Sequence, residues 1–141
     1  MVKYSLQPIA NICQPALANE PGHRYSQTPY KGEGLSQAVT AALSALNGRK
    51  AATVFSTMNG ENLHAKEWGV ANIRNQSSLA EKLRFEHPAD CYGDPGAAAG
   101  PIMIVLAALG LNEGHVQGPC MVYCSSEHEK RGAVCLLKAG T

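Results

Sequence analysis

The sequence predicts a single α/β domain: a mixed five-stranded sheet with helices on both faces. Strand and helix patterns alternate along most of the chain, as they do where helices cross over between strands of one sheet. The segment Ala97–Leu111 is apolar on nearly every side. The helix predicted there should therefore lie between this sheet and a second layer. Two apolar runs at the end of the chain predict an antiparallel hairpin.

Length and composition agree with one domain spanning residues 1–141. The chain has 141 residues, of which 45% are hydrophobic, enough for one core and too few for two ordinary domains. The formal net charge is +1, and acids and bases are interspersed. No basic stripe is available to follow a phosphate backbone, so we expect no nucleic acid partner.

The first elements follow from local patterns. A strand is predicted over Tyr4–Cys13, and the Gly-, Pro- and Asn-rich stretch Ala18–Gly34 is predicted to be a long loop. The apolar stripe over Leu35–Leu46 predicts a helix that stops at Gly48. The short, partly β-branched run Ala51–Ser56 predicts a second strand.

The middle of the chain predicts two helices, a strand and the start of the apolar helix. Glu61–Asn75 is a helix candidate, and Gln76–Leu83 a shorter one. The alternation over Leu83–His87 predicts a strand. Asp94–Gly96 is typical of a helix entry. Pro101 requires either that the helix begins later or that its first turns are kinked, and the sequence leaves both open.

The last two strands are expected at Cys120–Ser125 and Gly132–Lys138, on either side of a polar turn. Their pairing would complete a sheet of five strands.

No secretion or membrane signal is expected. The N-terminus lacks an apolar core and a small-residue cleavage site, which favours the cytoplasm. The apolar run is shorter than the roughly 20 residues that cross a bilayer, so we expect no membrane insertion. Five cysteines without a regular spacing are interpreted as reduced, mostly buried thiols.

Three stretches together resemble a known family. Tyr30–Leu35 precedes an Ala/Leu helix, Val54–Thr57 is followed by Glu67, and Tyr92–Gly100 opens the apolar helix with small residues. With the final hairpin, this pattern resembles the C-terminal half of the β-ketoacyl-acyl carrier protein synthases of the thiolase superfamily. The resemblance spans nearly the whole chain.

The resemblance implies one half of a layered α-β-α-β-α fold, whose other half holds a nucleophilic cysteine. In that family two histidines of the second half stabilise the enolate and the developing oxyanion. Here Thr57 and Asp94 stand at those positions, and an anionic Asp94 would repel such charge. The glycine-phenylalanine loop of the family is replaced by Glu127–Lys130. Condensation by this chain alone is therefore not expected, and whether it is an enzyme stays open.

Site residues follow from the same resemblance. Thr57 and Asp94 are the catalytic candidates, and the expected substrate-pocket residues are Asn59, Gly96 and Ser125. The first hypothesis is a β-ketoacyl synthase-like C-terminal domain that acts with a complementary thiolase-type half in fatty acid or polyketide-type acyl metabolism. The alternative is a non-catalytic acyl-binding or scaffold subunit of a lipid or polyketide assembly. Candidate partners are that half, a second copy of the chain, and an acyl carrier protein; no cofactor is expected.

A metal site is the main competing chemistry. His87 and Cys91 are four residues apart, and Cys120, Cys124 and His128 repeat that interval. Zinc accepts such ligands, but this spacing gathers side chains only on a helix, whereas these segments have strand and turn patterns. Dispersed thiols and imidazoles are the favoured interpretation, and no metal is expected.

Other chemistry-bearing residues have simpler interpretations. Cys91 near a helix entry is a candidate thiolate, but a strand-end cysteine packed in the core is favoured. Helix capping explains Asp94. His64 and Trp68, four residues apart on a predicted helix, are assigned to helix packing. Phosphate binding by Gly93–Gly100 lacks the required glycine spacing.

Overall fold

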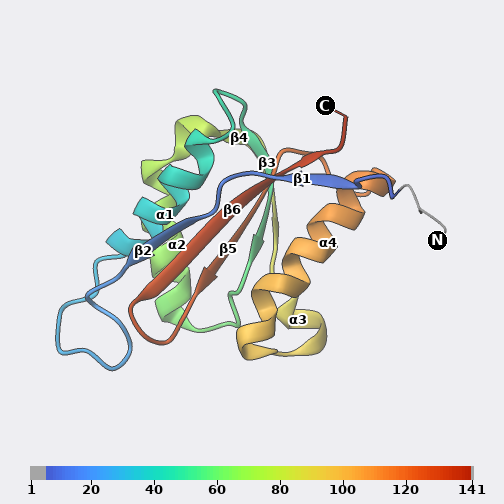
Figure 1. The fold of residues 1–141 in the computed structure, drawn as a ribbon. Coiled ribbons are helices and arrows are strands. Elements are labelled where there is room, and N and C mark those ends of the chain that lie inside the picture. Colours follow the sequence, from blue (N-terminus) through green and yellow to red (C-terminus); the bar gives the residue numbers. More distant parts are fainter. Residues whose placement is uncertain (1–5, 141) are drawn as a thin grey trace.

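The computed structural model describes residues 6–140 as six strands and four α-helices (Figure 1). In chain order these elements are β1 (Ala10–Ile12), β2 (Ala16–Asn19), α1 (Glu33–Ser44), β3 (Ala51–Ser56), α2 (Asn62–Arg74), β4 (Leu79–Glu86), α3 (Ala89–Tyr92), α4 (Ala99–Glu113), β5 (Cys120–Ser125) and β6 (Lys130–Lys138). Two short 3₁₀ turns, Gln76–Ser78 and Gly96–Ala98, precede β4 and α4.

One mixed sheet joins all the strands, in the order β1-β6-β5-β3-β4 with β2 also paired to β6. β3 is parallel to β4 and β5, and β6 is antiparallel to β5, β1 and β2. β1 pairs with the end of β6 and β2 with its start, so these two strands share one edge of the sheet. The predicted mixed sheet and the final hairpin are confirmed.

The first predicted strand differs from the observed one. Within the described residues it is limited to Ala10–Ile12, and Tyr4 and Ser5 lie outside them. The chain then pairs with β6 again at Ala16–Asn19, partly within the predicted loop. Pro15 separates the two strands, since proline has no amide proton to give to the ladder. The expected five strands are therefore six.

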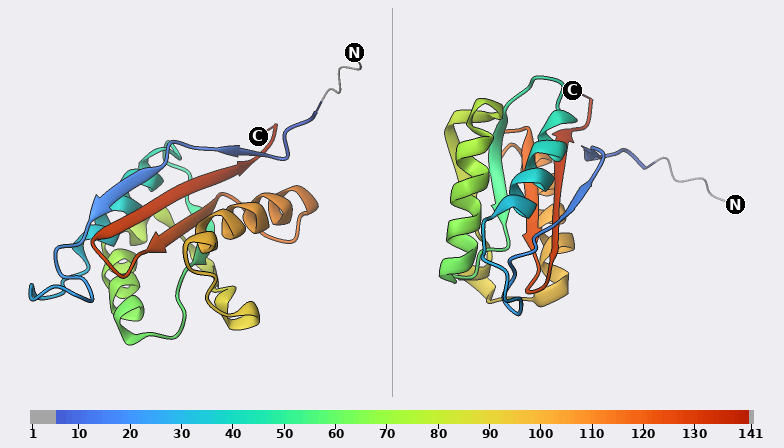
Figure 2. Two further views of the ribbon diagram at one scale, coloured as in Figure 1. Left: turned by 60° about the horizontal axis from the view of Figure 1, so that its bottom comes forward. Right: turned by 90° about the vertical axis from the view of Figure 1, so that its left-hand side faces the viewer.

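Helices cover both faces of the sheet, as predicted. α1 and α2 lie on one face and α4 on the other (Figure 2). Successive residues of β5 point to opposite faces. Met121 and Tyr123 pack in the core beneath α1, whereas Cys120 and Val122 pack against α4.

α1 confirms the helix predicted from the apolar stripe. Leu35, Val39 and Leu46 are completely buried, although the chain leaves the α-helix two residues before Leu46. Glu20, itself buried, accepts a hydrogen bond of 2.7 Å from the amide of Gly34 in the first turn. A carboxylate at this end of a helix satisfies a free N–H and favours the helix dipole.

α4 begins at Ala99, which decides between the two alternatives at Pro101. The proline is the third residue of the helix, where its missing N–H would have had no partner within the helix. Asp94 accepts a 2.8 Å hydrogen bond from the amide of Gly96 and so fixes the 3₁₀ turn before α4. Asp94 therefore supports the approach to the helix and is not the N-cap residue of α4.

The side of α4 that faces the sheet is buried, whereas its outer side is exposed. Met103 and Ala107 are buried on the sheet at 1% and 0% exposure. On the outer side Val105, Leu106 and Leu109 are 55%, 38% and 41% exposed. By length and composition alone, the 18 residues Gly96–Glu113 are apolar enough to cross a membrane, a test that core helices also pass. Within residues 6–140, no protein covers the apolar outer face of this helix.

Two expectations for the middle of the chain are wrong. The predicted helix Gln76–Leu83 is a three-residue 3₁₀ turn, after which β4 starts at Leu79. Leu79 and Leu83 are spaced for a helix, but pairing with β3 overrides that local preference. Cys91 is exposed on the short helix α3 and is not packed in the core.

Candidate functional site

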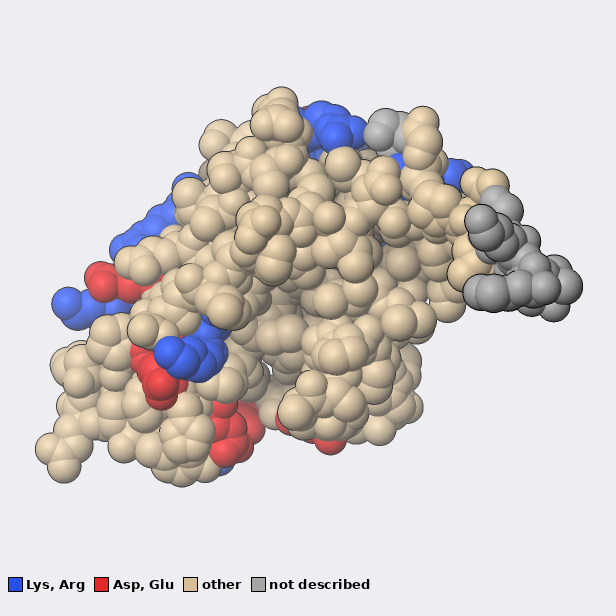
Figure 3. Space-filling view, viewed as in Figure 1, with Lys and Arg blue, Asp and Glu red and all other residues tan. Residues whose placement is uncertain are grey.

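A cavity of about 520 Å³ opens at the carboxyl ends of β3 and β5, between the starts of α2 and α4. This edge of an α/β sheet is where ligands commonly bind. In Figure 3 a hollow is visible at the lower part of the molecule, with acidic side chains on either side of it. The cavity is lined by Thr57, Asn59, Glu61, His64, Asp94, Gly96, Ala97, Ala99, Gly100, Pro101, Cys124, Ser125, Ser126 and Glu127.

All five residues expected at the site line this one cavity: Thr57, Asn59, Asp94, Gly96 and Ser125. The Oγ1 of Thr57 accepts a 3.1 Å hydrogen bond from the amide of Ser125, which joins the ends of β3 and β5. The Nδ2 of Asn59 donates to Asp94 over 3.1 Å and so joins the β3 end to the approach of α4. The structure thus brings the expected residues together, while their roles stay predictions.

A buried ion pair lies next to the cavity and contacts one of its lining residues. Glu67 of α2 and Arg131 of β6 are 0% and 1% exposed, and the Nε of Arg131 donates to Oε1 of Glu67. The other oxygen of Glu67 accepts a 2.6 Å hydrogen bond from the hydroxyl of Ser125. A lining residue is therefore fixed to a charged network that water does not reach.

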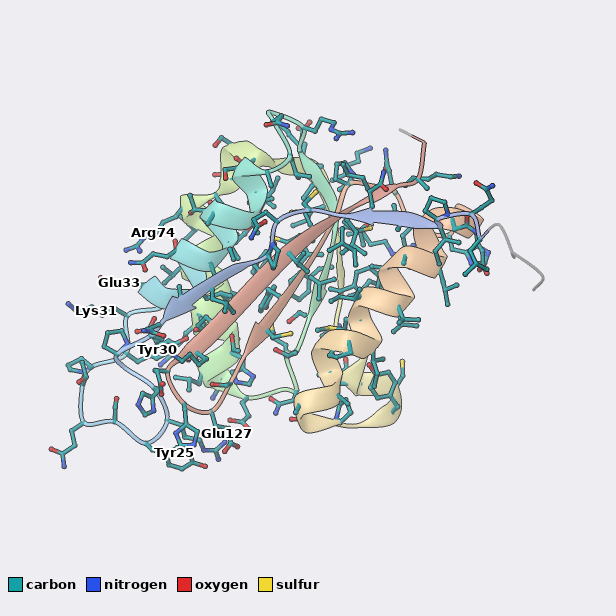
Figure 4. The ribbon with its side chains drawn as sticks, viewed as in Figure 1. Tyr25, Tyr30, Lys31, Glu33, Arg74 and Glu127 are labelled. Carbon is teal, nitrogen blue, oxygen red and sulfur yellow. The ribbon has the colours of Figure 1, made fainter. Side chains whose placement is uncertain are left out.

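An exposed polar cluster stands at the mouth of the cavity. Arg24 donates to Glu61 over 3.0 Å and to Glu127 over 3.5 Å. The hydroxyl of Tyr25 donates to Glu127 over 2.6 Å, and this hydrogen bond raises the pKa of Tyr25. Figure 4 shows Tyr25 and Glu127 side by side, next to the turn between β5 and β6. The long loop before α1 is thus attached to that turn.

His64 and Cys124 also line the cavity, although the sequence interpretation gave them no such place. The Nδ1 of His64 is buried and has no hydrogen-bond partner within residues 6–140. Burial raises the pKa of the Cys124 thiol to about 11, so it is protonated at neutral pH. A signal for His64 existed: it lies three residues after Glu61 in the first turn of α2, at the strand-end edge of the sheet.

Gly100 allows α4 to begin close to β5. A Cβ atom at this position would lie 3.0 Å from the Sγ of Cys124. A larger residue at Gly100 would therefore push the start of α4 away from β5 and change the cavity.

The residues considered for a metal site are not gathered. Cys120 and Cys124 face α4, whereas the ring of His128 lies 5.0 Å from that of Tyr25 at the β5–β6 turn. His87 lies 3.4 Å from Asp90. Within the described part of the chain, no group of three His, Cys, Asp or Glu side chains is arranged to hold a metal ion.

Comparisons with known proteins give structural matches only. No protein-family model and no curated protein matches the sequence. The Acat5 thiolase of Ascaris suum, solved with coenzyme A, matches 94% of this chain and 32% of its own, with a TM-score of 0.62 and 16% identity. An oxazolomycin ketosynthase domain of Streptomyces albus matches 92% of this chain and 44% of its own, with a TM-score of 0.65 and 13% identity. OleA of Xanthomonas campestris matches 93% of this chain and 56% of its own, with a TM-score of 0.61 and 9% identity.

These similarities define the fold. The chain adopts a thiolase-type α/β fold, shared with a thiolase and with ketosynthase-type enzymes. It spans between about a third and just over half the length of each of these proteins. The expected fold class is thereby confirmed, and at such low identity the similarity concerns the fold alone.

Proposed function

We propose that this chain is a thiolase-type half, equivalent to the C-terminal half of a β-ketoacyl synthase-like protein. It acts with a complementary thiolase-type half in fatty acid or polyketide-type acyl metabolism. That half is supplied by a longer polypeptide, a second copy of the chain or another subunit. An acyl carrier protein is a candidate source of the acyl group.

One observation carries this proposal: the chain matches its structural neighbours over nearly its whole length but covers at most 56% of theirs. The outer side of α4 supports it, because Leu106 and Leu109 are apolar and exposed. Exposed apolar patches of this kind on soluble proteins often mark interaction sites. We assign the acyl group to the cavity at the strand ends, whose lining includes Ala97, Ala99 and Pro101.

The second candidate is a non-catalytic acyl-binding or scaffold subunit, and Asp94 favours it. This carboxylate lines the cavity where the family resemblance places a histidine. A fixed negative charge raises the energy of an enolate or oxyanion formed beside it. Thr57 at the other histidine position offers only a neutral hydroxyl.

An acyl-coenzyme A with a photoreactive acyl chain tests the binding site. On irradiation, peptide mass spectrometry should find the label on peptides that contain the end of β3 or the start of α4. Ala97→Phe should reduce this labelling, because Ala97 lines the cavity. Ala98→Phe is the matched control, since the adjacent Ala98 is exposed and does not line it. Labelling confined to other surfaces, or equal losses in both variants, would refute the proposed site.

A second readout separates the two candidates. The chain is assembled with its complementary thiolase-type half and incubated with an acyl thioester. The intact mass of the assembled protein is then recorded. A covalent acyl adduct favours the condensing-enzyme half. Photolabelling without any adduct favours the binding or scaffold subunit.

A further inference from the structure

Two of the five free cysteines lie opposite each other at one edge of the sheet. Cys13 directly follows β1, and its amide donates a hydrogen bond of 2.9 Å to the carbonyl of Cys135 in β6. This bond continues the antiparallel register in which Ile12 is paired with Leu136. The chain pairs with β6 again at β2, so strand pairing flanks Cys13 on both sides (Figure 1). The two cysteines are therefore cross-strand neighbours, although they lie near opposite ends of the chain.

Both side chains lie on the face of the sheet that α1 covers. Cys135 belongs to the buried core cluster beneath α1, and Cys13 packs against the same cluster. Burial raises the pKa of Cys135 to about 12, and the thiols of Cys13 and Cys120 make smaller contributions in the same direction. The effect of Cys13 on Cys135 is the one expected of two thiols that are close together.

The backbone geometry of this pair suits a disulfide. Directly opposed residues of antiparallel strands have Cα atoms about 4.5 or 5.5 Å apart, depending on the hydrogen-bond pattern. A disulfide requires Cα atoms about 4.4–6.8 Å apart, with both Cβ atoms on the same side. Cys120 and Cys124 face α4 on the other side of the sheet, and Cys91 is exposed on α3. Within residues 6–140, the partner that the fold offers to Cys13 is therefore Cys135.

The two thiols differ in their access to solvent. Cys135 is 0% exposed, whereas Cys13 at the edge of the sheet is only partly buried. A small oxidant in solution therefore reaches Cys13 first.

We propose that Cys13 and Cys135 are a redox-active pair, which a low-molecular-weight disulfide such as oxidised glutathione converts into a disulfide that joins the end of β1 to β6. The Cys13 thiolate attacks the glutathione disulfide, forms a mixed disulfide and releases one glutathione thiolate. Cys135 then loses its proton, attacks the Sγ of Cys13 and displaces the second glutathione. The two protein thiols are oxidised, the glutathione disulfide is reduced, and the two thiol protons leave on the two glutathione molecules. The pair lies outside the cavity lining and does not depend on the proposed function.

Peptide mapping after oxidation of the folded full chain tests the pair. The chain is incubated with oxidised glutathione at about pH 8.5, where more of each thiol is ionised. Free thiols are then alkylated, and linked peptides are identified by mass spectrometry. A peptide that joins Cys13 to Cys135 should be the main link and should disappear on reduction. Cys13→Ala should abolish this link, whereas Cys91→Ala, at an exposed thiol, should leave it unchanged.

Unfolding by urea gives a second readout. A disulfide between distant positions restricts the unfolded chain, so the oxidised protein should unfold at a higher urea concentration than the reduced protein. Cys13→Ala should show no such shift. Glutathione on Cys91 without a link between Cys13 and Cys135 would show that the oxidant acted and that the pair does not react, which would overturn the inference. Links from Cys13 to Cys120 or Cys124 in similar amounts would mean reaction in the unfolded chain and would overturn it too.

Discussion

Arg131 and Glu67 form an ion pair that is almost completely withdrawn from water, although they lie 64 residues apart in the sequence. The guanidinium also donates to the backbone carbonyls of Ser126 and His128 over 3.0 and 2.6 Å, which fixes the β5–β6 turn. Glu67 holds the hydroxyl of Ser125. One buried pair thus positions the wall of the cavity that β5 and its turn supply.

Breaking this pair should destabilise the fold strongly. Arg131→Met leaves Glu67 as a buried charge without a cation, which typically costs about 3–5 kcal/mol. Arg84→Met is the control, since Arg84 is exposed and its pair with Glu86 should contribute less than about 1 kcal/mol. Urea unfolding measures both. Similar losses of unfolding free energy in the two variants would show that the buried Glu67–Arg131 pair stabilises the fold no more than the exposed Arg84–Glu86 pair does.

Two glycine substitutions should change stability in opposite directions. A Cβ on Gly34 would lie 2.7 Å from the amide nitrogen of Glu20, so Gly34→Ala should cost about 1–3 kcal/mol through a forced backbone shift. A Cβ on Gly69 in α2 meets no atom within 4 Å, and Gly69→Ala should gain up to about 1 kcal/mol of helix propensity. The thermal unfolding temperature should fall in Gly34→Ala and rise in Gly69→Ala. An unchanged Gly34→Ala protein would contradict the close approach of α1 to Glu20.

Stability should fall in alkaline solution. Burial raises the pKa of Cys120 to about 11 and that of Cys135 to about 12, from an ordinary value of 9.0. Below the ordinary value both states keep the protons, whereas above it the unfolded chain releases them first. The free energy of unfolding should therefore decrease as the pH rises above the ordinary thiol value, towards 11 and 12.

Urea titrations at about pH 8, 9 and 10 check this prediction. Cys135→Ala should reduce the pH-dependent loss, while Cys91→Ala should not change it, because Cys91 is exposed. A free energy of unfolding that stays constant or rises over this range would contradict the burial of these thiols.

The sequence predicted those elements that local pattern determines. β3 and β5 have the expected bounds because each is a short apolar run between turn residues. The apolar run at α4 predicted a helix packed against the sheet, and the first turn of that helix accommodated Pro101. The resemblance to a thiolase-type half indicated five residues that line one cavity, because each of them ends or follows a strand or precedes a helix at the same edge of the sheet.

The remaining features depend on tertiary contacts. β2 is only four residues of Ala, Leu and Asn, so it becomes a strand through pairing with β6 and not through propensity. The first part of β4, from Leu79, replaced the end of a predicted helix for the same reason, whereas Leu83–Glu86 lies in the strand that was predicted. The Glu67–Arg131 pair joins segments that are distant in sequence, so it carries no local signature.

The mass of the chain in solution tests the central claim most directly, namely that the outer face of α4 is covered by another thiolase-type half. In sedimentation equilibrium the chain alone should be heavier than one copy, because Leu106 and Leu109 expose an apolar face. The double variant Leu106→Glu and Leu109→Glu should restore a folded single copy. Leu17→Glu, at a leucine of β2 that is 82% exposed, should leave the association intact. A wild-type chain that sediments as a single copy, with a mass unaffected by the α4 substitutions, would contradict the account.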